Sequence, residues 1–379
     1  MRVLLVIDSF FTGGAEFSTL ELFSYLQSQG VTIHICKTKD MNPQYDPEKF
    51  GLHSSIITTL PEVGFRGKRI ALQELIATFQ PDIVHSVLFN SNLLVRTIRL
   101  FTCSFVHLES LVNHTYSEHR LNEPGVTRLK LAYYQLLDGI TGFLGTDHFH
   151  PNGYSVAHHY QKKLLISPKK MTVVHRGRKS HDNLQGILSK STFGIGEDTL
   201  VFINVARQEY QKGQDVLLDA VSLLPQSVLN SIHLLIVGRE GKSTPLLLEK
   251  IKEKKLTSNL TLLGHRDDIP SLLQMSDVFV FPSRFEGLPG VLIEAESLGL
   301  PIICTHLPMM LEVVEENVNA LTFALDNSKQ LADRITKMVE DASLRERFSI
   351  QSKTIFDEKF KIEFVHQKML DLYKSLVLK

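Results

Sequence analysis

The sequence has 379 residues, of which 43% are hydrophobic and 22% are charged, and its formal net charge is zero. This length accommodates two domains, each with its own core, and the composition excludes a fibrous or disordered chain. The neutral charge balance argues against general binding to nucleic acids.

The distribution of charge, the length of the apolar runs and the positions of the cysteines indicate where the protein works and how its thiols are used. Residues 1–180 carry 19 Lys and Arg against 14 Asp and Glu, so the first half is basic and the second acidic. The opening apolar run is too short for a signal peptide, and none approaches the roughly 18 residues of a membrane span, so we expect a cytoplasmic protein. Cys36, Cys103 and Cys304 lie far apart in apolar runs and indicate buried thiols rather than disulfides or a zinc site.

Strand-like and helix-like segments alternate in the first half. The strand-like runs are Val3–Asp8, Val31–Lys37, Asp82–Ser86, Ser104–Leu108, Ile140–Leu144 and Thr172–Arg176. Helical patterns such as Ala15–Gln29 and Val126–Leu137 separate several of them. This alternation predicts a parallel sheet with helices on both faces.

A linker-like stretch, Gly177–Ser189, precedes a second alternating series. Its strand-like runs are Thr199–Ala206, Ile232–Val237, Leu260–Leu263, Asp277–Phe281, Pro301–Thr305 and Ala320–Phe323. The series predicts a second doubly wound domain. The last segment, Lys359–Val377, is expected to be a helix with a broad apolar face.

Two features of the first half are candidates for ligand binding. Gly13 and Gly14 follow the first strand and lead into a helix, where free N–H groups can bind an anion, although such a pair is more often a tight turn. His107 comes near the end of a predicted strand, where ligands bind in open α/β sheets. A histidine in such a place is more often structural.

The second half contains cations and glycines at strand ends. Arg207 follows a strand and Lys212 precedes a helix, so both can point into the crevice at the carboxyl edge of the sheet; the alternative is two solvated cations. Gly238 and the turn at His265 also follow predicted strands. Each of these turns is a weak signal alone.

The segment Phe281–Pro301 reads as a strand end, a glycine-rich turn and a helix that starts near Gly290. Glu286 lies in the turn and Glu294 in the helix, with seven residues between them. The turn glycines allow close approach of a ligand, and the first helical N–H groups can face an anion. The spacing alone leaves open a plain turn with two solvated acids.

The pattern Ser-x-x-Glu-Gly-x6-Glu-Ala that begins at Ser283 resembles the donor-sugar motif of the retaining glycosyltransferases of GT-B architecture (glycosyltransferase group 1, Glu-x7-Glu motif). The block Arg-x4-Lys-Gly from Arg207 resembles the diphosphate clamp of that family. The resemblance implies an α/β GT-B fold with two Rossmann-like, doubly wound parallel-sheet domains facing across a cleft. Residues 1–180 would bind the acceptor, with the helix at about 359–379 packing back on them, and residues 181–358 would bind the nucleotide sugar.

The resemblance also implies roles for the candidate residues. Glu286 would act on the donor sugar, and His107 would face the 6-hydroxyl of that sugar. The donor would be bound by Arg207, Lys212, Glu294, Gly287, Leu288, Gly238, His265, Gly13 and Gly14. The chain has no Asp-x-Asp, so we expect no metal. The resemblance implies a UDP- or GDP-linked donor and no cofactor.

The implied function is a retaining hexosyl transfer to a glycan or lipid-linked acceptor in envelope polysaccharide synthesis. A basic first domain would allow peripheral contact with the inner face of the membrane. The sequence departs from the family where a Gly-Gly pair usually follows the strand Pro301–Thr305, and where Asn319-Ala320 replaces Asn-Gly. The donor's identity therefore stays open, as do two alternatives: a sugar-nucleotide epimerase of the same fold and a non-catalytic sugar-nucleotide-binding protein.

Overall fold

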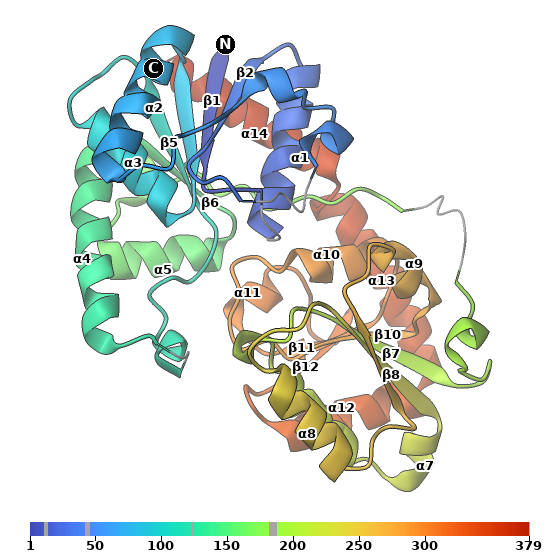
Figure 1. Ribbon diagram of the computed structural model, residues 1–379. Coiled ribbons are helices and arrows are strands. Elements are labelled where there is room, and N and C mark those ends of the chain that lie inside the picture. The colour runs from blue at the N-terminus through green and yellow to red at the C-terminus, as the bar shows by residue number, and fades with distance from the viewer. Residues whose placement is uncertain (11–13, 42–45, 123–124, 182–187, 379) are drawn as a thin grey trace. The chain divides into compact units, whose positions relative to one another are not determined.

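A computed structural model describes residues 1–10, 14–41, 46–122, 125–181 and 188–378. The chain divides into two compact units (Figure 1). The first contains Met1–Gly177 together with Glu363–Lys379, and the second contains Arg178–Ile362. These boundaries lie a few residues from positions 180 and 358.

The first unit is built on a six-stranded parallel sheet of order β3-β2-β1-β4-β5-β6. Its strands are β1 (Arg2–Ile7), β2 (Thr32–Lys37), β3 (Ile57–Thr59), β4 (Ile83–Val87), β5 (Val106–Leu111) and β6 (His148–Pro151). Its α-helices are α1 (Gly14–Ser28), α2 (Phe65–Phe79), α3 (Phe89–Arg99), α4 (Arg128–Gly145), α5 (Tyr154–Leu164) and α14 (Ile362–Val377). Short 3-10 turns are η1 (Pro47–Phe50), η2 (Ser54–Ile56), η3 (Glu118–Asn122) and η4 (Pro168–Lys170).

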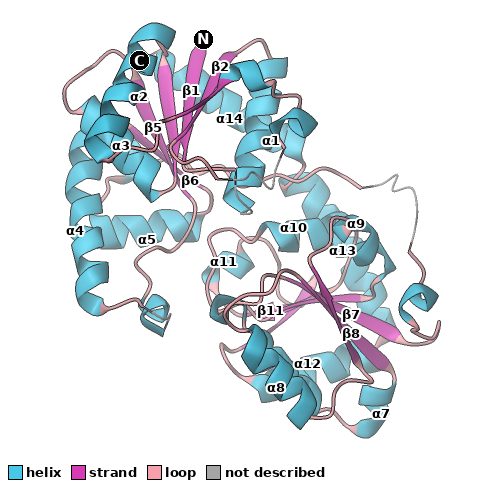
Figure 2. Ribbon diagram, in the orientation of Figure 1, coloured by secondary structure: helices cyan, strands magenta, loops and turns pink. Residues whose placement is uncertain are grey.

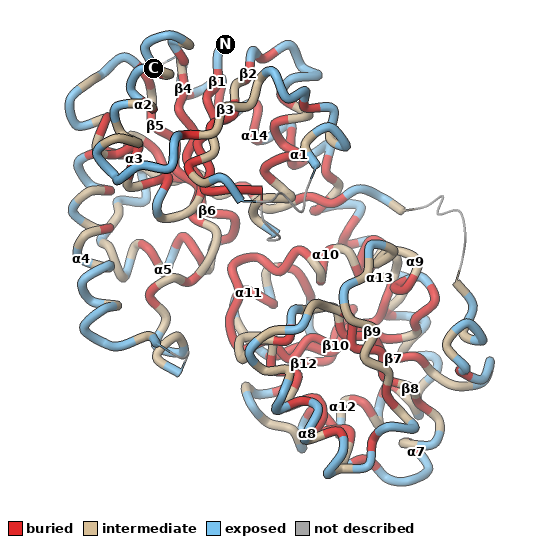
Figure 3. Tube along the Cα trace, in the orientation of Figure 1, coloured by how far each residue is buried: buried red, intermediate tan, exposed pale blue. Residues whose placement is uncertain are grey.

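Strand alternation gives this sheet two apolar faces. Along β1, the side chains of Val3 and Leu5 pack with α1 and α14, whereas those of Leu4 and Val6 pack with α2 and α3. Figures 1 and 2 show these helix pairs on opposite sides of the sheet. The run of apolar residues is continuous because both faces are buried, as the burial colours of Figure 3 show.

The second unit repeats this plan with the strand order β12-β11-β10-β7-β8-β9. Its strands are β7 (Leu200–Val205), β8 (Ile232–Val237), β9 (Leu260–Gly264), β10 (Val278–Phe281), β11 (Ile302–Thr305) and β12 (Ala320–Phe323). Its α-helices are α6 (Gln214–Ser222), α7 (Gln226–Asn230), α8 (Thr244–Glu253), α9 (Ile269–Met275), α10 (Gly290–Ser297), α11 (Pro308–Leu311), α12 (Ser328–Glu340) and α13 (Ala342–Lys359), with 3-10 turns η5 (Lys190–Phe193) and η6 (Tyr210–Lys212). The order reverses between β10 and β7, and ligands of open α/β sheets bind at the carboxyl ends of strands at such a point.

Helix α14 belongs to the first unit although it ends the chain. Its side chains Val365, Met369 and Leu370 lie in the same core as β1 and α1. The hydroxyl of Tyr373 lies 2.5 Å from Nδ1 of His85 in β4, and both residues are buried. This helix therefore completes a core whose other members come from the first half of the chain.

The six strands expected in the second half are confirmed, as are four of the six in the first. The run Ile140–Leu144 is wrong as a strand, because it lies inside α4. The run Thr172–Arg176 is not a strand either; a single bridge joins Met171 to Phe149. Strands β3 and β6 were not expected, and Cys103 is exposed in the loop before β5 rather than buried.

In the described part of the chain, no helix combines the length and the apolar character needed to cross a membrane.

Candidate active site

Two loops at the carboxyl edge of the second sheet carry several of the residues singled out in the sequence. One follows β7 and contains Arg207 and Lys212; the other follows β10 and contains Glu286. Strands β7 and β10 are neighbours in the sheet. The topology therefore brings both motifs to the point where the strand order reverses.

Hydrogen bonds fasten these two loops to each other. The carbonyl oxygen of Gln211 accepts from the backbone N–H of Arg284 at 2.8 Å and from Oγ of Ser283 at 2.9 Å. The side-chain amide of Gln211 donates to the carbonyl oxygen of Phe285 at 2.6 Å. Gly213 has φ +64°, and a Cβ there would overlap the carbonyl oxygen of Pro282, so only glycine fits this approach.

Arg284 holds the two loops in place through buried contacts, and the sequence analysis did not identify this residue. Its guanidinium is buried, donates to Asp215 at 2.7 Å and to Asp326 at 2.7 Å, and lies 4.2 Å from the ring centre of Tyr210. In the sequence it occupies an unspecified position of the Ser-x-x-Glu pattern. The planar guanidinium can bond two carboxylates and stack on an aromatic ring at the same time, which the ammonium group of a lysine cannot do.

Lys212 and Glu286 meet at this edge. Nζ of Lys212 lies 2.5 Å from Oε1 of Glu286, and Oγ of Ser283 donates to the same oxygen at 2.6 Å. The two charged side chains are 14% and 12% exposed, so each retains an accessible surface. Arg207, by contrast, is exposed two residues beyond the end of β7.

Glu294 lies on α10, as expected, but it is not an open acid. Its Oε1 accepts from Nε of Arg178 at 2.6 Å. The side chain of Glu294 is 27% exposed and that of Arg178 only 6%. Arg178, which the sequence analysis did not assign to the site, therefore covers part of the surface of Glu294.

The remaining second-unit candidates differ in their surroundings. Gly238 has φ +145°, and a Cβ there would overlap the carbonyl oxygen of Ala206, so this glycine is required by the approach of two loops. His265 is exposed beyond β9, with Nε2 3.5 Å from Oδ1 of Asp267. Gly287 is buried in the turn, and Leu288 packs into the core beside α10.

In the first unit, the described residues include only one of the two glycines of the expected turn. Gly13 lies outside the described residues, and Gly14 is the first residue of α1. A Cβ on Gly14 would lie 3.1 Å from Nη1 of Arg176, so a guanidinium stands beside this helix start. Gly14 and Arg176 both belong to the first unit.

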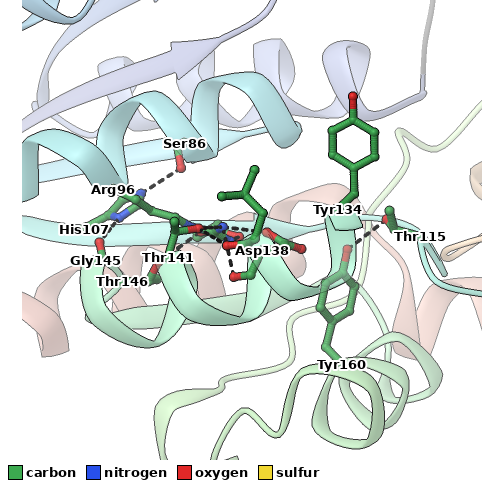
Figure 4. Close-up of polar contacts among 12 residues, drawn as sticks. Ser86, Arg96, His107, Thr115, Tyr134, Asp138, Thr141, Gly145, Thr146 and Tyr160 are labelled. Atoms are coloured by element: carbon green, nitrogen blue, oxygen red, sulfur yellow. Dashed lines mark hydrogen bonds and ion pairs between the residues drawn. The ribbon is translucent and has the colours of Figure 1, made fainter. Parts of the chain in front are cut away.

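The expected place of His107 is wrong. β5 starts at Val106, so His107 is its second residue and lies at the amino edge of the sheet rather than at its end. The ring is fully buried; Nδ1 lies 2.7 Å from the carbonyl oxygen of Gly145 and Nε2 lies 2.8 Å from Oγ of Ser86 (Figure 4). Burial lowers the pKa of His107 to about 3, so it is a neutral core histidine in the structure.

A buried ion cluster stands beside His107 and holds α4 to the sheet. Arg96 of α3 donates to Glu109 of β5 at 2.6 Å. It also donates to Asp138 of α4 at 2.5 Å (Figure 4). Tyr116 donates to the other oxygen of Asp138 at 2.6 Å. Because every charge has a close partner, this cluster reads as structural.

His114 is a histidine at the edge where His107 was expected. It comes three residues after the end of β5. The residue is 8% exposed, and its ring lies 5.0 Å from that of His159. A histidine after the strand was visible in the sequence, but the expected strand ended at Leu108, whereas β5 ends at Leu111. The described residues contain no group of three or more His, Cys, Asp or Glu placed to hold a metal ion.

Comparisons with known proteins identify families and relatives that resemble this chain. Residues 188–354 match the profile of the family Glycosyl transferases group 1, and residues 12–179 match that of Glycosyltransferase Family 4. The capsular polysaccharide biosynthesis glycosyltransferase CapH of Staphylococcus aureus is 24% identical over 391 residues, which cover 100% of both chains. An Escherichia coli UDP-Gal:alpha-D-GlcNAc-diphosphoundecaprenol alpha-1,3-galactosyltransferase is 28% identical over 230 residues, 57% of each chain.

Solved structures share the fold along almost the whole chain. The crystal structure of Anabaena Alr3699/HepE in complex with UDP has a TM-score of 0.83 at 16% identity and covers 99% of this chain and 100% of that one. WaaG, a glycosyltransferase involved in lipopolysaccharide biosynthesis, has a TM-score of 0.76 at 16% identity and covers 98% of this chain and 99% of its own. The α/β GT-B fold expected from the sequence is confirmed.

Proposed function

For a chain made of two glycosyltransferase domains, Family 4 in residues 12–179 and group 1 in residues 188–354, we propose the retaining transfer of a hexose from a nucleotide diphosphate sugar to a glycan or lipid-linked acceptor in envelope polysaccharide synthesis. The observation that carries the proposal is the junction of the two loops at the carboxyl edge of the second sheet. It places the ammonium of Lys212 against the carboxylate of Glu286.

Charge at this junction suits the departure of a diphosphate. Breaking the bond between the anomeric carbon and the diphosphate leaves negative charge on the phosphate and positive character on the carbon. Lys212 and the exposed Arg207 would hold the diphosphate, assisted by the N–H groups at the start of α10. Glu286 would bind the sugar hydroxyls and stabilise the anomeric carbon, and Glu294 would accept hydrogen bonds from the ribose.

The remaining parts of the proposal follow from the same arrangement. The acceptor oxygen forms the new bond to the anomeric carbon, and its proton passes to the departing diphosphate. With the diphosphate charge held by side chains and backbone, we propose that the transfer needs no metal and no cofactor.

Names of similar proteins support the substrates proposed here. Alr3699/HepE was solved with UDP and with UDP-glucose, so we propose UDP as the first nucleotide to test and GDP as the second. The galactosyltransferase of Escherichia coli is named for an acceptor on diphosphoundecaprenol. A polyprenyl-diphosphate saccharide is therefore the acceptor class that we propose.

A binding screen followed by turnover tests this function. UDP- and GDP-sugars are screened by thermal shift, since a ligand that binds the folded state raises the unfolding temperature. The stabilising donor is then incubated with and without a polyprenyl-diphosphate saccharide, and the products are identified by NMR. We expect slow hydrolysis of the donor alone and a new α-linked or β-linked product that keeps the donor's anomeric configuration.

Other outcomes would contradict the proposal. An epimeric sugar nucleotide formed from the donor alone would show an epimerase. Donor binding with neither hydrolysis nor transfer would show a binding protein. Inversion at the anomeric carbon would contradict retention alone.

We further propose that α4 rests on an anionic membrane surface, which would carry a lipid-linked acceptor. Six large apolar side chains of α4 are each more than half exposed: Leu129, Tyr133, Leu136, Ile140, Phe143 and Leu144. Their spacing of three, four and seven residues puts them along one side of the helix, and Figure 3 shows α4 with exposed stretches over its length.

Cations adjoin this apolar stripe. Nζ of Lys170 lies 5.9 Å from the ring centre of Phe143. The side chain of Gln135 in α4 donates to the carbonyl oxygen of Lys163 at 2.8 Å, which places Lys162 and Lys163 beside α4. An apolar helix face flanked by lysines is the arrangement that binds anionic headgroups together with acyl chains.

Flotation with vesicles of phosphatidylcholine, with or without 30% phosphatidylglycerol, tests this contact. We expect binding to the anionic vesicles only, weaker at high salt, and reduced by Leu136→Ser or Phe143→Ser. Ile350→Ser is the matched control, since Ile350 is an exposed apolar residue of the second unit. A protein that stays unbound with anionic vesicles at low salt would contradict the contact.

A further inference from the structure

Arg178 is the first residue of the second unit, and its side chain reaches the helix that carries Glu294. Nε of Arg178 lies 2.6 Å from Oε1 of Glu294. The guanidinium also lies against Gly290, where a Cβ would overlap it. The side chain of Arg178 is 6% exposed, so this is a buried cation placed beside an acid proposed to bind ribose.

The backbone of Arg178 is fixed where the chain passes between the two units. Its N–H donates to the carbonyl oxygen of Phe360 at 2.9 Å, and its carbonyl oxygen accepts from Ile362 at 3.0 Å. The chain leaves the first unit after Gly177 and returns to it at Glu363. Both passages are therefore joined by hydrogen bonds at the residue that holds Glu294.

This arrangement is not explained by the stability of α10. The N-terminal end of a helix carries partial positive charge, which disfavours a cation there. Arg178 stands beside Gly290, the first residue of α10, and Glu294 provides its compensating charge one turn further on. A cation at this position is better suited to orienting the carboxylate of Glu294 than to supporting the helix.

One oxygen of Glu294 is left for another partner. In the part of the chain that the structure describes, Oε1 is bonded to Arg178, no hydrogen bond to Oε2 is found, and the side chain is 27% exposed. A carboxylate that binds a ribose must hold its accepting oxygen in one direction. A buried guanidinium bonded to the other oxygen meets this condition.

We propose that Arg178 is a positioning residue of the nucleotide site, which fixes the carboxylate of Glu294 and aims its other oxygen at the ribose hydroxyls. The inference rests on the function proposed above. Arg178 itself acts through Glu294.

The test compares nucleotides that differ only in the ribose. Dissociation constants of UDP, 2′-deoxy-UDP and 3′-deoxy-UDP are measured by calorimetry on the full chain, with GDP and ADP in parallel. We expect the wild type to bind at least one deoxy analogue about tenfold more weakly than UDP, as for loss of a hydrogen bond to a charged group. In Arg178→Gln this preference should shrink to about threefold or less, because UDP binding falls while binding of that analogue changes little.

Two further variants separate positioning from a general structural effect. Arg178→Lys keeps the charge but loses the Nε contact, and should show an intermediate preference for UDP. Lys179→Gln removes a neighbouring exposed cation and should keep the wild-type preference. Should Arg178→Gln fail to fold, the value for Arg178→Lys decides, and an unchanged preference there overturns the proposal.

The possible failures are distinguishable. An equal fall in affinity for UDP and both deoxy analogues would show a structural role and overturn the positioning role alone. An unchanged preference in Arg178→Gln would do the same. If wild type binds none of UDP, GDP and ADP, both the proposed function and this inference are overturned.

Discussion

Nζ of Lys212 lies 2.5 Å from Oε1 of Glu286, although the two residues come from different loops and are 74 positions apart. The cation proposed for the diphosphate and the acid proposed for the sugar therefore neutralise each other in the free protein. A bound donor would bring its own negative charge to Lys212. A donor phosphate that binds Lys212 would therefore also change the charge around the carboxylate of Glu286, which is proposed to lie beside the sugar.

Substitution should separate the two roles. Lys212→Met is expected to weaken UDP binding and to lower donor hydrolysis by about 100-fold or more, as for loss of a group that stabilises developing charge. Glu286→Gln should lower hydrolysis by a similar factor while UDP, which lacks the transferred sugar, binds nearly as in wild type. Calorimetry with UDP and a hydrolysis assay measure these effects, and Lys252→Met of α8 serves as the control cation. Near-normal hydrolysis in both site variants would refute the assignment.

The close approach at Gly213 predicts a loss of stability. Gly213→Ala would force a side chain to φ +64° and press its Cβ against the carbonyl oxygen of Pro282. Gly264→Ala is the matched control, because Gly264 has the same φ but nothing within 4 Å of its Cβ position. We expect about 1–2 kcal/mol for the control, from backbone strain alone, and a clearly larger loss for Gly213→Ala. Urea denaturation compares them; equal losses would show that the contact with Pro282 has no cost.

Glu296 predicts a pH-dependent effect on stability. The carboxyl group is fully buried, Oε1 accepts from Asn319 at 2.8 Å, and Oε2 has no hydrogen-bond partner among the described residues. Burial raises the pKa of Glu296 well above its usual value. The folded state therefore favours the neutral acid, and stability falls as the pH rises above the unfolded pKa of about 4.3 toward the folded one.

Glu296→Gln removes this titration while it keeps the shape of the side chain. The variant should match the wild type near pH 4 and become more stable at pH 8, by roughly 1–3 kcal/mol, because no buried charge has to be avoided. Thermal unfolding from pH 4 to pH 8 measures the difference. A difference that stays constant with pH would contradict burial of a titrating acid.

The buried ion cluster of the first unit predicts a contrast between two arginines. Arg96→Met leaves Glu109 and Asp138 without their shared cation, and should cost about 3–5 kcal/mol of unfolding free energy. Arg99, which lies on the same helix as Arg96, forms a partly exposed pair with Asp147, and Arg99→Met should cost about 0–1 kcal/mol. Denaturation of both variants gives the comparison. Similar losses would mean that burial of the charges does not govern their contribution.

Sequence reasoning was most successful where a strand is buried on both faces. The strands of the second unit are continuous apolar runs bounded by turn residues, so β7 and β10 could be located before the structure. Ile140–Leu144 has the composition of a strand, yet it lies in α4 with Ile140, Phe143 and Leu144 exposed. Periodicity over five residues cannot distinguish a strand from an exposed helix face.

The candidate site divides in the same way. Lys212, Glu286 and Glu294 lie in motifs with fixed spacing, so their positions at the carboxyl edge followed from the strand ends. His107 was misplaced because β5 begins two residues later than expected and ends at Leu111. The partners Arg178 and Arg284 were not predictable, because their contacts join residues 116 and 69 positions apart.

The position of α14 has a consequence for synthesis. The second unit is one continuous stretch, Arg178–Ile362, whereas the first needs Glu363–Lys379 to fill its core. During translation, the second unit can be complete while the first still lacks the helix that contributes Met369 and Tyr373. The half of the protein made first is therefore the half that finishes folding last, and a chain shortened at its carboxyl end would expose the apolar surface of the opposite terminus.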